Sequence, residues 1–149
     1  MCSKGVPGTV ETGYADRQPF YCKETLAVNI GTDIVNIERI AQVLDKQGDR
    51  FLNRILTVAE REVYRQRGEP VKFLANRFAA KEAIAKALGT GIASGVTFQA
   101  IEILPDERGA PCARLYGVAL ETQRFLGASK VHISLADETD YVVAFAVIV

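Results

Sequence analysis

VKFLANRFAAKEAIAKAL, residues 71–88, is the stretch of sequence that decides the fold class. It consists almost entirely of good helix formers. Pro70 stands where the first turn of a helix accepts a proline, and Gly89 follows as a stop signal. The sequence therefore predicts one long helix here, the clearest in the chain.

The segment before this helix begins with a strand and continues as helices. Residues 26–35, LAVNIGTDIV, are β-rich and mostly apolar, which predicts a strand buried on both faces. Gly31 would let another backbone approach this strand closely. Residues 37–56 repeat apolar side chains at helical spacing around Gly48, which predicts a helix, a break and a short helix.

Capping chemistry and turn residues place the remaining elements. Thr57 and Glu60 fit a capping box that opens a helix over about 58–67. Further patterns predict a β-hairpin over 97–116 with PDERGAP as its turn, a helix over about 118–126, and two strands, KVHISLA and YVVAFAVIV, around DETD. The expected fold class is α+β, with a mainly antiparallel sheet packed against the long helix.

Length and composition favour one intracellular globular domain. The chain has 149 residues, 48% of them hydrophobic, and its 18 basic and 18 acidic side chains balance. This balance does not indicate a nucleic-acid or membrane-surface binder. The cysteines Cys2, Cys22 and Cys112 show no CxxC spacing, and a single histidine is available to complete a zinc site. We expect ordinary cytosolic thiols.

The N-terminal segment differs in composition from the rest. Residues 1–24 are rich in Gly, Pro, Thr and charge without periodicity, and strong patterning begins directly after them. We expect a loose extension over 1–24 and one domain over 25–149. No run has the length of a signal-peptide core or a membrane span, so a cytoplasmic protein is expected.

Asp33 is the first candidate site residue, because its carboxylate interrupts an apolar strand. Burying such a group without a partner costs several kcal/mol. A metal ion would compensate for that cost. Alternatively, Asp33 caps the following helix or lies at the solvated end of the strand.

The long helix carries the second group of candidates. Glu82 and Lys86 are four residues apart and share a face with Phe78, while Arg77 and Lys81 form a second, basic row. The alternative to a functional cluster is a surface ion pair between Glu82 and Lys86, worth a few tenths of a kcal/mol.

His132 and Ser134 form the third group. Alternate side chains of a strand share a face, so both point to one side of VHISLA, while its apolar residues point to the other. A histidine beside a serine suits phosphate binding or a hydrolase pair. No G-x-S-x-G elbow is present, and a structural pair is the alternative.

In combination, three segments resemble the holo-acyl-carrier-protein synthase family in order and spacing. They are GTDIVNIERI, FLANRFAAKEAIAKALGTGI and VHISLADE. The resemblance covers about residues 28–149, and its most specific parts are GTDIV and RFAAKEAIAKA. It implies transfer of 4'-phosphopantetheine from coenzyme A to a serine of acyl carrier protein for fatty acid biosynthesis, with release of 3',5'-ADP.

The resemblance also implies the roles of the catalytic residues. The aspartate of GTDIV and the glutamate of KEA hold magnesium in the family, which makes Asp33 and Glu82 the expected Mg²⁺ ligands. Two carboxylates suit Mg²⁺ when substrate phosphates and water complete its octahedron. Lys86 would stabilise charge on the leaving group. The serine proton could pass to Glu82, to Asp33 or to a metal-bound water.

The same resemblance suggests where the substrates bind. Arg77 and His132 match positions around the coenzyme's phosphates, with Ser134 as a further hydroxyl contact. The loop GTGIASG after the long helix would border the nucleotide. Acyl carrier protein is acidic, so a basic docking face is expected, headed by Arg39 with Arg50 and Arg54. For Arg50 and Arg54, a solvated helix face is the alternative.

The oligomeric state and the type of carrier protein modified are also expected from the family resemblance. Members of this single-domain class form homotrimers with active sites between neighbouring subunits. Larger relatives that serve polyketide or peptide synthases duplicate the domain, and this chain holds one copy. An idle relative that binds coenzyme A without chemistry is disfavoured, because Asp33, Glu82 and Lys86 are all present.

Overall fold

A computed structural model describes residues 28–149. The predicted extension over 1–24 and the first residues of the predicted strand, Leu26 and Ala27, lie outside the described residues. The elements follow in the order β1 (Asn29–Asn36), α1 (Ile37–Gln47), α2 (Asp49–Ile55), α3 (Val58–Gln66), α4 (Val71–Ala87), the 3₁₀ turn η1 (Phe98–Ala100), β2 (Ile101–Pro105), β3 (Pro111–Leu115), α5 (Gly117–Phe125), β4 (Val131–Asp137) and β5 (Tyr141–Ile148). The α+β prediction is confirmed.

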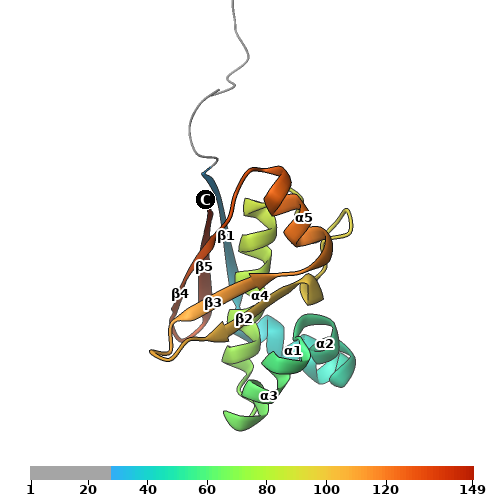
Figure 1. Cartoon of the computed structure of the whole chain (residues 1–149). Coiled ribbons are helices and arrows are strands. Elements are labelled where there is room, and N and C mark those ends of the chain that lie inside the picture. The colour runs from blue at the N-terminus through green and yellow to red at the C-terminus, as the bar shows by residue number, and fades with distance from the viewer. Residues whose placement is uncertain (1–27) are drawn as a thin grey trace, which may run out of the picture.

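Two antiparallel sheets and one long helix organise these elements. A three-stranded sheet has the order β1-β5-β4, and β2 and β3 form a separate hairpin. Helix α4 packs against β1 and β5, while α1, α2 and α3 gather around one end of α4 (Figure 1). The predicted long helix is thus the centre of the fold, and its alanines pack directly against the sheet.

Gly31 makes the close approach that the sequence predicts. A Cβ atom at this position would lie 2.6 Å from the backbone nitrogen of Ala87 and closer still to the carbonyl oxygen of Ala83. A side chain of any size would therefore push α4 away from β1. Strand β1 and helix α4 touch backbone to backbone, which fixes how residues 82 and 86 lie relative to residue 33.

The expectation that the first strand is buried on both faces is wrong for a single copy of the chain. Alternate side chains of β1 and β5 face α4, and the others are exposed on the outer face of the sheet. Ile34, for example, is 65% exposed, and Val143 and Phe145 of β5 lie on the same outer face. Within the described residues, no element of the chain covers this apolar face.

Some helix caps and strand ends agree with the sequence predictions, and others differ from them. The capping box is confirmed, since the Thr57 hydroxyl accepts from the Glu60 N–H and the Glu60 carboxylate accepts from the Thr57 N–H. Pro70 is the cap residue just before α4 and not part of its first turn. The predicted strand over 97–104 begins only at residue 101, because residues 98–100 turn to bury the Phe98 ring. No helix among the described residues is long and apolar enough to span a membrane.

Candidate active site

A pocket of about 600 Å³ lies between β1, α1, α2 and α4. Asp33 and Glu82 contribute carboxylates to its wall, and Arg39 and Arg54 contribute guanidinium groups. The apolar part of the wall includes Ile40, Val43, Phe51 and Phe78. A pocket with charged groups of both signs and an apolar wall suits a ligand that carries phosphate and hydrocarbon parts.

Lys86 holds the Asp33 carboxylate in place. Its Nζ donates to Asp33 Oδ1 at 2.8 Å and to the carbonyl oxygen of Thr32 at 2.9 Å. The interpretation of Asp33 as a helix cap is wrong, because Asn36 caps α1 by accepting from the Arg39 N–H. The costly carboxylate within β1 is therefore stabilised by a cation from α4.

Glu82 lies close enough to Asp33 for the two carboxylates to affect each other. Burial raises the pKa of Glu82, the negative charge of Asp33 raises it further, and Lys86 opposes the shift. The alternative of a surface ion pair between Glu82 and Lys86 is wrong, since Lys86 pairs with Asp33. Two carboxylates that repel each other beside one lysine create a site that favours an added cation.

The donor set at this site fits Mg²⁺. Asp33 and Glu82 supply hard oxygen ligands at one end of the pocket, and Mg²⁺ is commonly held by one or two carboxylates together with substrate phosphates and waters. No group of three or more histidine, cysteine, aspartate or glutamate side chains suited to a metal occurs among residues 28–149. A site with two protein ligands leaves room for substrate oxygens.

Arg77 and Ser134 line a second pocket, of about 520 Å³, on another side of α4. Arg67 and Lys72 make this pocket basic, with Asp137 at its edge. The Arg77 guanidinium lies 4.4 Å from the centre of the Phe73 ring. Burial lowers the pKa of Arg77 to about 10, against the opposing charge of Glu60.

His132 faces a third pocket, of about 600 Å³, between β3 and β4. Arg114 and Lys130 also line it. The predicted alternation along β4 is confirmed, because His132 and Ser134 are exposed while Val131 and Ile133 pack against the core. Neither His132 nor Ser134 lines the pocket that contains Asp33 and Glu82. One copy of the chain thus keeps the predicted phosphate contacts apart from the carboxylates.

The three arginines predicted to dock a carrier protein are exposed near the first pocket. Arg39 is on α1, and Arg50 and Arg54 are on α2. Arg39 and Arg54 line the pocket itself, whereas Arg50 does not. The first pocket thus connects a basic outer edge to the carboxylate pair.

Lys81, predicted to form a basic row with Arg77 on α4, is buried. Its side chain is fully buried against Glu60, with 2.6 Å between Nζ and Oε2. A partial signal for this burial is present in the sequence, because Phe78 precedes Lys81 by three residues and Ile84 and Ala85 follow it by three and four, so its helical neighbours are mostly apolar.

Comparison with known proteins is consistent with this geometry. The model of the 4'-phosphopantetheinyl transferase superfamily matches residues 29–146. A holo-[acyl-carrier-protein] synthase of Shewanella amazonensis is 53% identical over 121 residues, which cover 81% of this chain and 97% of that protein. The crystal structure of the Neisseria meningitidis holo-[acyl-carrier-protein] synthase aligns with a TM-score of 0.75 and 46% identity, covering 83% of this chain and 98% of that one. The Helicobacter pylori enzyme, solved in complex with coenzyme A, aligns with a TM-score of 0.72 and 28% identity, covering 80% and 99%.

Proposed function

The chain belongs to the 4'-phosphopantetheinyl transferase superfamily, and from this membership and the geometry of its site we propose how it acts as a holo-[acyl-carrier-protein] synthase. It transfers 4'-phosphopantetheine from coenzyme A to a serine of acyl carrier protein, converts apo to holo carrier for fatty acid biosynthesis, and releases 3',5'-ADP. The observation that carries this proposal is the cluster of Asp33, Glu82 and Lys86 at the end of a pocket with basic side chains.

Asp33 and Glu82 are the proposed Mg²⁺ ligands. When bound, Mg²⁺ would neutralise charge on the pyrophosphate and orient it for attack. The support is the neighbouring carboxylates on two elements that touch backbone to backbone. Because β1 and α4 are rigid, the two carboxylates hold their separation without help from a loop.

In the reaction, the serine oxygen forms a bond to the phosphorus that bears pantetheine, and the bond from that phosphorus to the bridging oxygen breaks. The leaving electrons remain on 3',5'-ADP, and the serine proton passes to a base at this end of the pocket, where Glu82 and Asp33 are both candidates. Lys86 already points at this end of the pocket and is well placed to stabilise the developing charge.

Arg77, His132 and Ser134 are proposed to contact the coenzyme's phosphates. Arg77 lines the basic pocket together with Arg67 and Lys72, and a guanidinium group suits a phosphate oxygen. Their separation from Asp33 and Glu82 within one copy supports a site built by two neighbouring subunits.

A homotrimer is the proposed assembly. The apolar outer face of the β1-β5-β4 sheet would be covered by neighbouring copies, which would bring His132 and Ser134 of one subunit toward the carboxylates of another. A cytoplasmic location is proposed as well.

The basic edge formed by Arg39, Arg50 and Arg54 is proposed to dock acyl carrier protein. Helices α1 and α2 present these side chains to solvent, and Arg39 and Arg54 line the first pocket. An acidic helical partner would be steered there by charge, with its serine entering along the apolar wall.

Release of 3',5'-ADP tests the proposed chemistry directly. The protein is mixed with coenzyme A, Mg²⁺ and apo acyl carrier protein, and nucleotide products are separated by chromatography. We expect 3',5'-ADP to form only when all components are present. Binding of coenzyme A without any 3',5'-ADP would instead support an idle relative. A faster reaction with a carrier domain of a polyketide or peptide synthase would show that this domain, and not acyl carrier protein, is the preferred substrate.

A further inference from the structure

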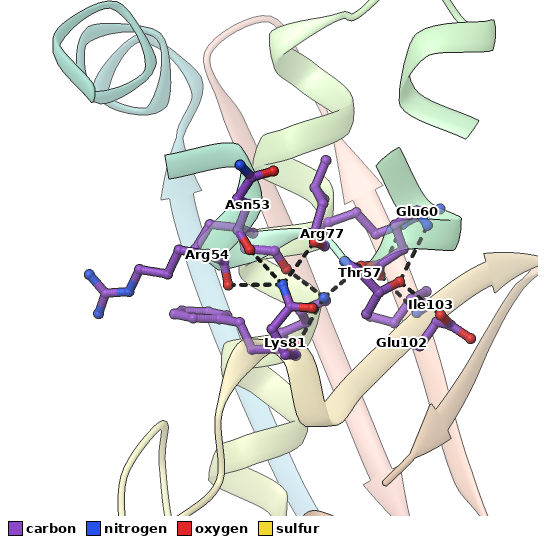
Figure 2. A network of polar contacts seen from close by, with 12 residues as sticks. Asn53, Arg54, Thr57, Glu60, Arg77, Lys81, Glu102 and Ile103 are labelled. Carbon is purple, nitrogen blue, oxygen red and sulfur yellow. Dashed lines mark hydrogen bonds and ion pairs between the residues drawn. The ribbon is translucent and has the colours of Figure 1, made fainter. Parts of the chain in front are cut away.

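A fully buried ion pair ties the long helix to three other elements (Figure 2). The Lys81 and Glu60 side chains are each 0% exposed. Lys81 Nζ donates to Glu60 Oε2 at 2.6 Å, to the carbonyl oxygen of Ile55 at 2.6 Å and to that of Phe98 at 2.9 Å. An ammonium has three donors, so all of them are used. The lysine thereby fixes α4 to the end of α2, the start of α3 and η1.

Glu60 is held as firmly as its partner. Its Oε2 also accepts from the Thr57 N–H at 2.8 Å, and its Oε1 accepts from the Ile103 N–H at 2.8 Å. The carboxylate therefore joins the first turn of α3 to β2. The Arg77 Nε lies 3.9 Å from Oε1 and adds a second positive charge nearby. Little freedom is left for either member of the pair to adopt another position.

The last turn of α2 depends on this network. Carbonyl groups at the end of a helix have no partner within the helix. The carbonyl of Ile55 accepts from Lys81, and those of Asn53 and Leu56 accept from the Gln99 side chain at 2.8 Å each. The Lys81 contact attaches α2, with its exposed Arg54, to the helix that carries Glu82, and the Gln99 contacts attach it to η1.

A stability role alone does not explain why this pair is charged. Replacing a buried ion pair by apolar residues of similar volume is often neutral or stabilising. Directed hydrogen bonds from an ammonium, in contrast, allow one arrangement of their partners. Lys81 directly precedes Glu82, so whatever Lys81 fixes in space is fixed relative to the proposed metal ligand. On its other side, α4 is fixed by its contact with Gly31.

We propose that Lys81 and Glu60 are positioning residues that set the spacing between the carrier-docking helix α2 and the catalytic helix α4. The spacing brings the serine of a docked carrier to the phosphorus held at Asp33 and Glu82. This inference rests on the proposed function and deepens it. It predicts that removing the Lys81–Glu60 ion pair leaves the binding surfaces for coenzyme A and for the carrier protein intact. The distance between these two surfaces would change, so the serine would no longer reach the phosphorus.

The test uses the double variant Lys81→Met/Glu60→Gln in the full chain, because either single change would leave Lys81 or Glu60 as a buried charge without its partner; Arg77, 3.9 Å from Glu60 Oε1, then lies beside a neutral amide. Three quantities are measured on folded protein: the Kd for coenzyme A with Mg²⁺, the Kd for apo acyl carrier protein, and kcat. We expect both Kd values to stay near those of the wild type. We expect kcat to fall on the order of a hundredfold, the effect of misplacing reacting groups by about 1 Å.

Two further variants make the result specific. Arg65→Met removes a charge from an exposed pair with Glu62 on α3 and should leave all three quantities unchanged. Gln99→Met releases the same turn of α2 without altering a buried charge, and should lower kcat by a smaller factor with both Kd values preserved. If the double variant does not fold, Gln99→Met decides alone.

The outcomes separate the inference from the proposed function. A kcat equal to that of the wild type in the folded double variant overturns the inference. If the double variant does not fold, a wild-type kcat in Gln99→Met overturns it. So does a loss of both affinities together with kcat in the folded double variant, which indicates a purely structural pair. An inactive wild type with every carrier tried would overturn the proposed function, and the inference with it.

Discussion

Replacing Gly31 with alanine perturbs the contact on which the proposed metal site depends. The new Cβ atom would lie 2.6 Å from the Ala87 nitrogen, and ordinary contacts begin at 3.4 Å. The two backbones must therefore separate by at least 0.8 Å, the difference between these distances. Neither partner can rotate away, because the nearest atoms belong to the backbone of α4.

Both stability and turnover should respond to this displacement. Overpacking of a core typically costs about 1–3 kcal/mol. The displacement moves Asp33 away from Glu82 and Lys86, and a misplacement of about 1 Å reduces rates on the order of a hundredfold. Urea unfolding gives the change in free energy, and transfer assays at a temperature where the variant is folded give kcat.

Gly127→Ala is the matched control. Gly127 has a positive φ of 72° and open space around it, so the substitution strains the backbone without a clash. That strain costs about 1–2 kcal/mol, at a position that takes no part in the contact between β1 and α4. We expect lower stability with unchanged kcat. If Gly31→Ala loses stability but keeps full turnover, the close contact of β1 with α4 does not set the catalytic geometry.

Three other predictions address the same site and its assembly. Asp33→Ala and Glu82→Ala should abolish Mg²⁺-dependent turnover while the far-UV circular dichroism stays that of the wild type; turnover in either variant would refute the ligand assignment. Burial raises the pKa of Glu82 in the folded protein above its ordinary value of 4.5. The metal-free protein therefore loses stability as the pH rises from below 4.5 through this raised pKa, because the ionised carboxylate is less favourable in the folded state than in the unfolded state. Glu82→Gln should therefore raise the metal-free Tm at neutral pH, with the gain vanishing near pH 4, and a lower Tm at neutral pH would contradict this. Phe145→Asp places a charge on the exposed apolar sheet face and should give a folded monomer by analytical ultracentrifugation; an unchanged assembly would show that this face is not the interface.

Local sequence signals predicted most of the elements. Helix propensity and Gly89 placed α4 to within one residue of its observed end. The capping box placed the start of α3, because the reciprocal bonds between Thr57 and Glu60 join residues only three positions apart in the sequence. Gly31 was interpretable as a point of close approach, since a strand glycine has few other uses.

Long-range contacts were beyond the reach of the sequence pattern. The pairing of Lys81 with Glu60 joins residues that are 21 positions apart, and spacing along α4 alone indicated only that Lys81 forms a basic row with Arg77. The same limit applies to Asp33, whose partner Lys86 lies 53 positions away. The strand β1 read as buried on both faces because its outer side chains are apolar, although nothing within one described copy covers them.

The intact mass of apo acyl carrier protein after incubation with this protein, coenzyme A and Mg²⁺ tests the central claim most directly. A gain of about 340 Da, the mass of one phosphopantetheine arm added by the proposed transfer, is expected, and EDTA should prevent it. A carrier whose mass stays the same in the presence of Mg²⁺ would contradict the account, and a gain that persists in EDTA would contradict the metal site at Asp33 and Glu82.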